Sequence, residues 1–319
     1  MNGCGERPSY QVTRQLMQAR HPLTSFCHRV RLSRLTISSA EYLTSIFTQS
    51  AGSLMARDGK SMHPKEGQFV AALAKGLGVL QCFSPSTPEL GSSEIARMTG
   101  MPQPTVWRLC STLIQLGFLV VVPGRQTMRP GISLLGLGQA VLSGLPIGEL
   151  ALTDMQSMAS RHEGAVSLGA RDGLSMLFLQ RCQGSAIIVA DLRVGSRIPI
   201  ATSATGWAYL AALDAVTRNK LISELSASLG KQWSVIEPKL DTALRQFAKQ
   251  GYVVSKGSSN ARINAVAVPV KSPDGSVILS LSSAGISEIF HAEKLAQLGA
   301  ELKLLAAKLA PLLSYQRVS

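Results

Sequence analysis

The spacing of apolar residues along the chain changes abruptly at Phe69. Before it, residues 1–66 are rich in Ser, Thr and Arg and show no sustained helical or strand period, so we expect a disordered extension. After it, apolar residues recur every three or four positions, which predicts an amphipathic helix that ends before the SPSTPE segment. These residues are Val70, Leu73, Ala74, Leu77 and Leu80.

Two further interpretations of residues 1–66 stay open. An Arg-rich, acid-poor stretch is also typical of an organelle transit peptide, although the rest of the chain argues against an organelle. Alternatively, Met55 or Met62 is the natural start, and the residues before it are a translated upstream stretch.

Residues 92–131 continue with a pattern of helix, turn, helix and hairpin. Ser92 or Ser93 is suited to cap a short helix that ends at Gly100 in the left-handed conformation. A Gly-Met-Pro turn follows, and the next helix has Pro104 in its first turn and ends at Gly117. FLVVV, the PGRQ turn and TMRPG then predict a two-stranded hairpin. This order of elements is that of a winged helix-turn-helix domain, which we assign to residues 67–131.

Beyond this domain, we expect a linker helix over residues 132–146 and a second domain over residues 147–317. Helical patterns occur at about residues 148–162, 203–213, 215–228, 237–250 and 291–313. Strand patterns occur at about residues 165–171, 174–181, 186–191, 252–255, 263–271 and 276–283. Because strands and helices alternate without a strict βαβ rhythm, we predict an α+β ligand-sensing domain on an antiparallel sheet.

The charge of the chain favours a polyanionic partner. The formal net charge is +13, while charged residues make up only 16% and hydrophobic residues 45% of the sequence. Residues 1–66 hold nine Lys and Arg against four acids, and residues 67–131 hold five against two, whereas the remainder is mixed in sign. A basic chain can bind nucleic acid or an anionic membrane, but no run of about 18 apolar residues exists to span a bilayer. The sign of the charge does not separate nucleic acid from an anionic membrane surface, but the winged helix-turn-helix order favours double-stranded DNA as the partner, and we expect no membrane.

The predicted second helix of the helix-turn-helix carries side chains suited to DNA. Gln and Arg are residue types that read base edges in the major groove, and a Thr near a helix N-terminus can hold a phosphate. Two arginines of the hairpin could straddle the backbone or enter the minor groove. The candidate DNA-binding residues are Ser93, Gln103, Pro104, Thr105, Trp107, Arg108, Ser111, Arg125 and Arg129.

A plain helical hairpin with a solvated arginine is the alternative to a DNA-binding surface. Trp107 has two interpretations of its own: it contacts a partner, or it leans onto the preceding helix and is structural.

The sequence contains few residues suited to catalysis, metal binding or redox sensing. The five cysteines include no CxxC pair and no metal-like spacing with the histidines, so we expect no metal and no cofactor. His162 and His291 have no nucleophile motif nearby, which disfavours an enzyme domain. A thiol sensor using Cys182 stays an alternative, although only Arg181 is at hand to lower its pKa.

Several segments together resemble the IclR family of bacterial transcriptional regulators. AKGLGVLQCF, SSEIARMTGMPQPTVWRLCSTLIQLGFL and GRQTMRPGISLLGLG resemble its DNA-binding domain. RVGSRIPIATSATGWAYLAAL and QGYVVSKGSSNARINAVAVPVKSPDGSVILSLSSAG resemble its effector-binding domain, in the same order along the chain. The resemblance spans about residues 68–315. It implies a winged helix-turn-helix joined to a GAF-like domain, in a cytoplasmic bacterial dimer or tetramer that binds a palindromic operator and a small organic effector.

The resemblance also implies an effector pocket between the start of the ATSATG helix and the late strands. By position, Ala204 and Thr205 would offer backbone N–H groups to an anion. The other pocket residues by position are Ser255, Ile263, Ala265, Leu281 and Ser283.

The chain departs from the family pattern at the pocket and at the hairpin. It has Ser255 and Lys256 where an organic-acid-sensing relative carries an acid. Ala265 and Leu281 stand where polar side chains can occur, so we expect an aromatic or partly apolar carboxylate as effector. Met128 and Pro130 replace a frequent aromatic residue and a common leucine, which leaves the hairpin contacts open.

Overall fold

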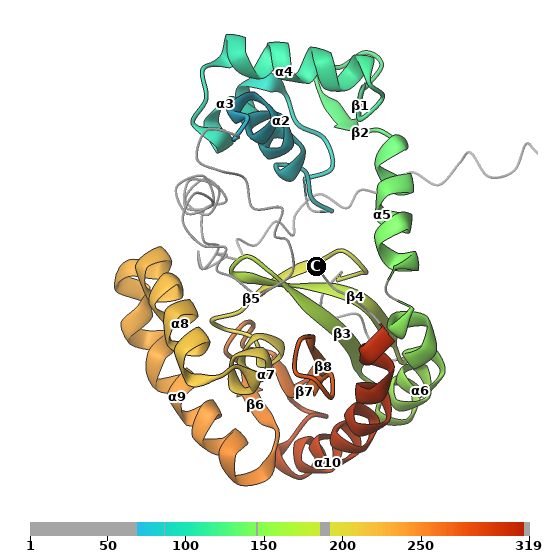
Figure 1. Cartoon of the computed structure of the whole chain (residues 1–319), viewed down its shortest axis with the longest axis vertical. Helices are drawn as coiled ribbons and strands as arrows, with labels where there is room; N and C mark the ends of the chain where they lie inside the picture. Colours follow the sequence, from blue (N-terminus) through green and yellow to red (C-terminus); the bar gives the residue numbers. More distant parts are fainter. Residues whose placement is uncertain (1–68, 86, 145, 186–191, 316–319) are drawn as a thin grey trace, which may run out of the picture. The chain divides into compact units, whose positions relative to one another are not determined.

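The computed structural model of the chain describes residues 69–85, 87–144, 146–185 and 192–315 (Figure 1). The extension expected over residues 1–66 and the strand expected near residues 186–191 lie outside this part of the chain. Within it, no single helix is long and apolar enough to cross a bilayer. Only α5 (Ser133–Ser143) and α6 (Ile147–His162) pass that test together, as a pair bent by 83°.

The N-terminal part is a winged helix-turn-helix, as the sequence predicts. Its elements are α2 (Ala71–Gln81), α3 (Ser92–Thr99), α4 (Gln103–Gln115), β1 (Leu119–Val121) and β2 (Met128–Pro130). The strands β1 and β2 pair antiparallel, with Val120 opposite Arg129. Gly100 at φ 68° and Gly117 at φ 75° take the left-handed conformation after α3 and α4, which a glycine adopts without steric cost.

The cap of α3 differs from the prediction. Gly91, not Ser92 or Ser93, is the N-cap residue. Its backbone N–H donates to the Glu94 carboxylate over 2.8 Å, in the manner of the acidic half of a capping box. Ser92 and Ser93 are therefore the first two residues of the helix itself.

One apolar core holds these three helices and the hairpin together. It is formed by buried residues from every element, among them Val79, Ile95, Val106, Cys110 and Leu119. The hairpin is also tied to the segment before α3, because Leu90 and Met128 exchange backbone hydrogen bonds of 3.0 and 2.8 Å. The hairpin is thus held to the three helices by packing and to the segment before α3 by backbone pairing.

The C-terminal part is built on a six-stranded antiparallel sheet with strand order β5-β4-β3-β8-β7-β6 (Figure 1). Its strands are β3 (Ala165–Asp172), β4 (Ser175–Gln183), β5 (Arg197–Pro199), β6 (Val253–Lys256), β7 (Ile263–Lys271) and β8 (Ile278–Ile286). Its further helices are α7 (Ala204–Ala212), α8 (Ala215–Leu229), α9 (Trp233–Gln250) and α10 (Ala292–Leu309). The predicted α+β class is confirmed.

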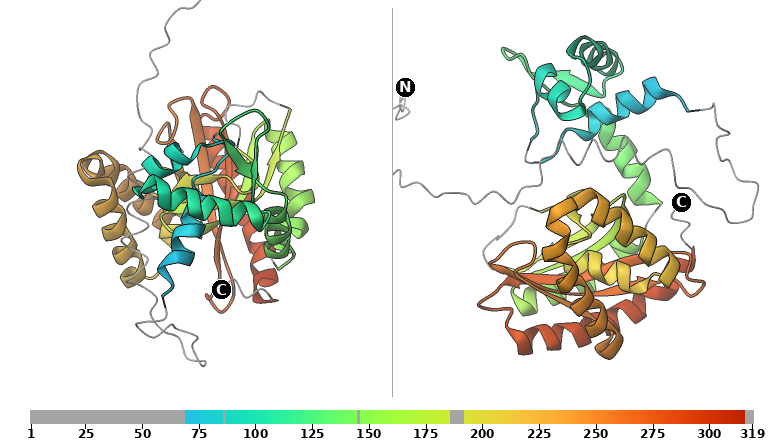
Figure 2. Two further views of the ribbon diagram at one scale, coloured as in Figure 1. Left: turned by 90° about the horizontal axis from the view of Figure 1, so that it is seen from above. Right: turned by 90° about the vertical axis from the view of Figure 1, so that its left-hand side faces the viewer.

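Two separate cores cover the two faces of this sheet. Helices α6 and α10 pack on one face, and α7 packs on the other, where α8 and α9 complete the second core. The views from the front and from above show the α8 and α9 pair and α10 on different sides of the strands (Figures 1 and 2).

Several elements differ from the prediction; among them, α10 ends at Leu309 rather than near residue 313. β5 was not predicted, and α9 begins at Trp233 rather than near residue 237, with Pro238 inside it. The last strand runs over Ile278–Ile286 instead of about residues 276–283.

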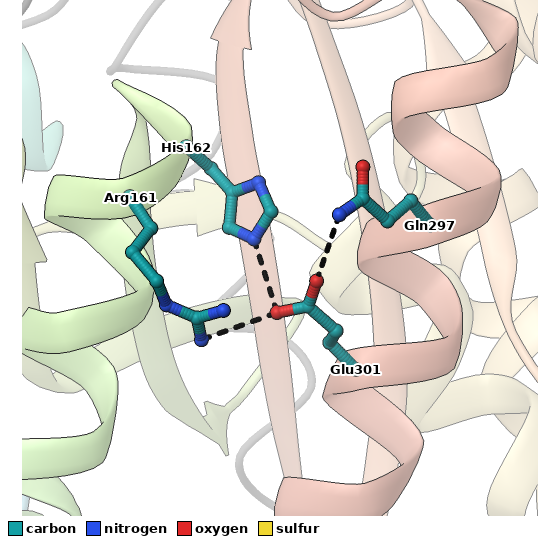
Figure 3. Close-up of polar contacts among 4 residues, drawn as sticks. All are labelled: Arg161, His162, Gln297 and Glu301. Carbon is teal, nitrogen blue, oxygen red and sulfur yellow. Dashed lines mark hydrogen bonds and ion pairs between the residues drawn. The ribbon is translucent and has the colours of Figure 1, made fainter.

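A polar cluster joins the end of α6 to α10 (Figure 3). The buried His162 ring places Nε2 3.0 Å from the Glu301 carboxylate, and Arg161 lies 3.2 Å from the same oxygen. Gln297 donates to the other oxygen of that carboxylate over 3.1 Å. Burial raises the pKa of Glu301, but the hydrogen bond and charge of His162 and the charge of Arg161 outweigh it, so the pKa is lowered overall.

Candidate nucleic-acid interface and ligand cavity

The outer face of α4 is open to solvent. Val106, Cys110 and Leu113 turn into the core of the domain, which leaves the other side of the helix free. Of the predicted residues on α4, Gln103, Pro104, Trp107 and Arg108 are exposed, and Thr105 and Ser111 are partly buried. The helix therefore presents donors and acceptors along a face that a DNA major groove can accept.

Trp107 lies on this outer face with 56% of its surface exposed. It is absent from the buried and partly buried residues that form the core around α2, α3 and α4. The structure therefore favours the interpretation in which Trp107 contacts a partner over the one in which it supports its own domain.

The hairpin and α3 add further exposed groups. Arg125 and Arg129 are exposed, as is Ser93 on α3. Arg125 pairs with Glu89 over 3.0 Å, but an ion pair this exposed contributes little and can exchange for a phosphate. Arg97 on α3 is also exposed and was not among the predicted residues.

The C-terminal domain contains a cavity of about 390 Å³ on the α7 side of the sheet. Its floor is made of small side chains. The pairing register of the strands aligns these side chains in two rows across the sheet. The first row contains Ser167 and Ser282, and the second contains Ala165, Ala284, Ala265 and Ser255. Residues of β5, the start of α7 and the segment before β7 form its walls. The volume is in the range of small-molecule sites.

Five of the seven predicted pocket residues line this cavity. Ala204 and Thr205 are at the start of α7, and Ser255, Ile263 and Ala265 are on β6 and β7. Leu281 and Ser283 do not, and this part of the prediction is wrong. Leu281 lies in the core against α6 and α10, and the buried Ser283 hydroxyl has no partner among the described residues. Because side chains alternate along a strand, their neighbours Ser282 and Ala284 face the cavity instead.

Hydroxyl groups form a chain of hydrogen bonds across the floor. Thr205 Oγ1 donates to Ser282 Oγ over 3.0 Å, and Ser282 Oγ donates to the Ser167 carbonyl over 3.4 Å. At the start of α7, Ser203 is the N-cap and accepts from the backbone N–H of Gly206 over 3.1 Å. The backbone N–H groups of Ala204 and Thr205 point out of the first turn without a helical partner.

Arg181 of β4 also lines the cavity and was not among the residues predicted from the sequence. Its Nη1 donates to Ser167 Oγ over 2.9 Å, and its guanidinium carbon lies 5.6 Å from the centre of the Phe178 ring. Burial lowers the pKa of this guanidinium. The sequence indicates only that Arg181 lies on a strand next to Cys182. The face of the sheet to which its side chain points depends on a bulge in β4, opposite Leu168 and Gly169.

The thiol alternative is disfavoured by the surroundings of Cys182. This residue is buried, and burial raises the pKa of its thiol, so little thiolate forms at neutral pH. Its Sγ donates to the carbonyl of Leu152 over 3.8 Å, on the face of the sheet away from the cavity. Among the described residues, no group of three or more His, Cys, Asp and Glu is arranged to hold a metal ion.

A winged helix-turn-helix with an open recognition face, joined in one chain to a domain with a ligand-sized cavity, defines a ligand-responsive DNA-binding regulator. Residues 72–123 match the IclR helix-turn-helix domain, and residues 139–310 match the family described as bacterial transcriptional regulator IclR C-terminal. The chain belongs to the IclR family of bacterial transcriptional regulators. It binds DNA through the helix-turn-helix and is modulated by a small organic effector.

Similar proteins span most of the chain. The HTH-type transcriptional regulator TsaQ1/TsaQ2 of Comamonas testosteroni is 34% identical over 202 residues, which cover 63% of this chain and 72% of the relative. The crystal structure of an IclR family regulator from Brucella abortus is 36% identical, with a TM-score of 0.71, and covers 79% of this chain and 95% of that one. An IclR homologue of Microbacterium hydrocarbonoxydans, complexed with 4-hydroxybenzoate, shares the fold at 24% identity. Its TM-score is 0.62, and the match covers 78% of this chain and 100% of the homologue.

Proposed function

We propose that the protein is a homo-oligomer that binds a palindromic operator and changes its affinity for that operator when a partly apolar carboxylate occupies the cavity. The observation that carries this proposal is the exposed outer face of α4. This face presents Gln103, Trp107 and Arg108 in the N-terminal half of the helix, where a recognition helix contacts bases. A face of this kind has no role in the packing of the domain, and its residue types suit base edges.

The proposed DNA contacts divide into two classes. Arg108 and Gln103 read bases, and Trp107 packs against sugar or a thymine methyl group. Ser93, Pro104, Thr105, Ser111, Arg125 and Arg129 position the domain on the phosphate backbone or in the minor groove. Only the first class is expected to give sequence specificity.

Self-association is proposed from the apolar surface that the chain leaves uncovered. No residue of α5 is buried, and Leu135, Leu137 and Val141 are exposed along it. Leu73 and Leu77 on α2 are exposed as well. Contiguous exposed apolar side chains indicate an interface, and two copies related by a two-fold axis would present two recognition helices to a palindrome.

The effector class is proposed from the composition of the cavity. Its floor of Ala and Ser offers a flat, partly apolar surface, while the start of α7 offers two backbone N–H groups to an anion. The 4-hydroxybenzoate bound by the Microbacterium homologue is a ligand of this kind. We further propose that the domain is a sensor without catalytic activity, and that the protein acts in the bacterial cytoplasm, where its DNA target is.

Protection of DNA upstream of the gene, measured with and without candidate effectors, tests the proposal. We expect a protected palindrome and a change in its midpoint concentration with an aromatic monocarboxylate. Thermal-shift measurements on the same compounds test the effector class separately. Stabilisation by small dicarboxylates alone would contradict an apolar carboxylate, and the absence of any protected sequence would contradict the operator.

A further inference from the structure

We infer that the guanidinium of Arg181 holds the acid group of the effector, so that the cavity selects an organic monoanion with a flat apolar body. This inference rests on the proposed function, because it concerns the ligand of the same cavity. Thr205 and the backbone N–H groups at the start of α7 would then assist in binding the acid group, and Arg181 would be the residue that determines specificity for an anion.

The first argument is charge. Among the described residues, no carboxylate lies within ion-pair distance of Arg181. Arg197, the other arginine of the cavity wall, is neutralised by Asp172 over 2.7 Å. The acid of the described lining, Glu163, is exposed to solvent. Within the described residues, the partly buried charge of Arg181 therefore has no counter-charge, and an anion in the cavity would supply one.

The second argument is the supply of hydrogen-bond donors. A carboxylate only accepts hydrogen bonds, and a hydroxyl has one proton to donate. Thr205 Oγ1 already donates to Ser282, and Ser203 Oγ donates to the Pro199 carbonyl over 2.6 Å. Arg181 has five N–H donors and gives one of them to Ser167 over 2.9 Å. The guanidinium therefore keeps the largest reserve of donors, and the backbone N–H groups of α7 can add to it.

The third argument is shape. Residues 178 and 181 would face opposite sides of a regular strand, but the bulge in β4 brings both to the cavity side. The Phe178 ring then lies beneath the guanidinium, with 5.6 Å between its centre and Cζ, and limits the directions in which the fork can point. In the second row of the cavity floor, Ala165, Ala284 and Ala265 present no bulky side chains. A planar apolar body fits above such a floor.

Calorimetric titration of the full chain with benzoate and with benzamide tests the inference, because the two probes share their shape and differ in charge. We expect the native protein to bind benzoate more tightly than benzamide. Arg181→Gln should weaken benzoate by about 10- to 100-fold, the loss typical of charge-assisted hydrogen bonds, and leave benzamide within about threefold. Arg245→Gln on the exposed side of α9 is the control for the loss of one positive charge and should change neither probe.

Arg181→Lys is measured alongside, because it keeps the positive charge. It provides a second test of the inference should Arg181→Gln fail to fold. We expect it to weaken benzoate by a smaller factor, since lysine lacks the planar fork. Unchanged benzoate affinity in Arg181→Gln would overturn the inference and leave the proposed effector class standing. Equal loss of both probes would overturn it as well, because it would indicate a damaged cavity rather than a lost charge partner. If the native protein preferred benzamide, or bound neither probe, the inference and the proposed effector class would both fail.

Discussion

Replacement of Gly206 by alanine probes how closely α7 approaches the backbone of Ile200, which follows β5 along the chain. A Cβ at Gly206 would lie 2.3 Å from the carbonyl oxygen and 2.4 Å from the Cα of Ile200. Both are backbone atoms, so no side-chain rotation can relieve the contact, and either α7 or the loop before it has to move. The Ser203 cap and the N–H groups of the first turn would move with it.

Two effects of this substitution oppose one another. Alanine inside a helix is favoured over glycine by up to about 1 kcal/mol. Forcing a methyl group into a packed interior costs about 1–3 kcal/mol, and the contact distances at Ile200 place Gly206 at the upper end. The clash therefore dominates, and we expect a net loss of roughly 1–2 kcal/mol, a fall in Tm of about 2–8 °C for a domain of this size.

Differential scanning fluorimetry of the full chain measures this change, with Gly76→Ala as the matched control. Gly76 is inside α2, and a Cβ there would meet only Leu109 Cδ2, at 3.9 Å. The control should therefore leave Tm unchanged or raise it. If Gly206→Ala raised Tm in the same way, the close approach of α7 to residue 200 would be refuted. We also expect weaker benzoate binding in Gly206→Ala, because the displaced first turn contributes the backbone donors.

Three further substitutions test other parts of the molecule. Arg108→Ala should cost about 1–3 kcal/mol of operator affinity if it reads a base, as measured by fluorescence anisotropy, and unchanged affinity would remove it from the recognition set. Arg125→Ala should instead weaken binding to all sequences alike and lower the salt dependence, and a sequence-dependent loss would contradict a phosphate contact. The lowered pKa of Glu301 means that its ionised form stabilises the fold above the unfolded pKa and that this stability is lost as pH falls through the folded pKa. Glu301→Gln should therefore unfold more easily at neutral pH and show a weaker acid dependence of Tm, and a Tm profile that parallels the native one between pH 7 and 3 would contradict this role.

The helix-turn-helix could be predicted well because its signals are local. Glycine after each helix, a proline in the first turn and an apolar period of three and four are properties of short segments, and the structure has Gly100 and Gly117 where these signals place them. The cap of α3 was misplaced because two serines competed with Gly91, and the side chain that decided it, Glu94, is three residues further on.

The cavity could be predicted only in part because it depends on register. The start of α7 and the small residues of β6 and β7 were found, but the face presented by β8 was taken one residue out of phase. A shift of one residue turns the opposite face of a strand toward the cavity. Leu281 and Ser283 were therefore predicted to line it, whereas Ser282 and Ala284 do so. Arg181 was missed for a related reason. The bulge that brings it to the same side as Phe178 breaks the period of two on which a strand assignment rests.

Strand β4 contacts both the cavity and α6 within the C-terminal domain. An effector changes DNA affinity only if it binds the DNA-competent and DNA-incompetent arrangements with different affinities. Some element of the domain must therefore contact the effector and also differ between the two arrangements. Arg181 faces the cavity, whereas its neighbours contact α6 on the other face of the sheet. Gln180 Nε2 donates to the Gly148 carbonyl over 3.4 Å, and Cys182 Sγ donates to that of Leu152 over 3.8 Å. Because α6 comes after the linker helix α5 along the chain, we expect an anion bound by Arg181 to act on the strand against which the first turns of α6 pack.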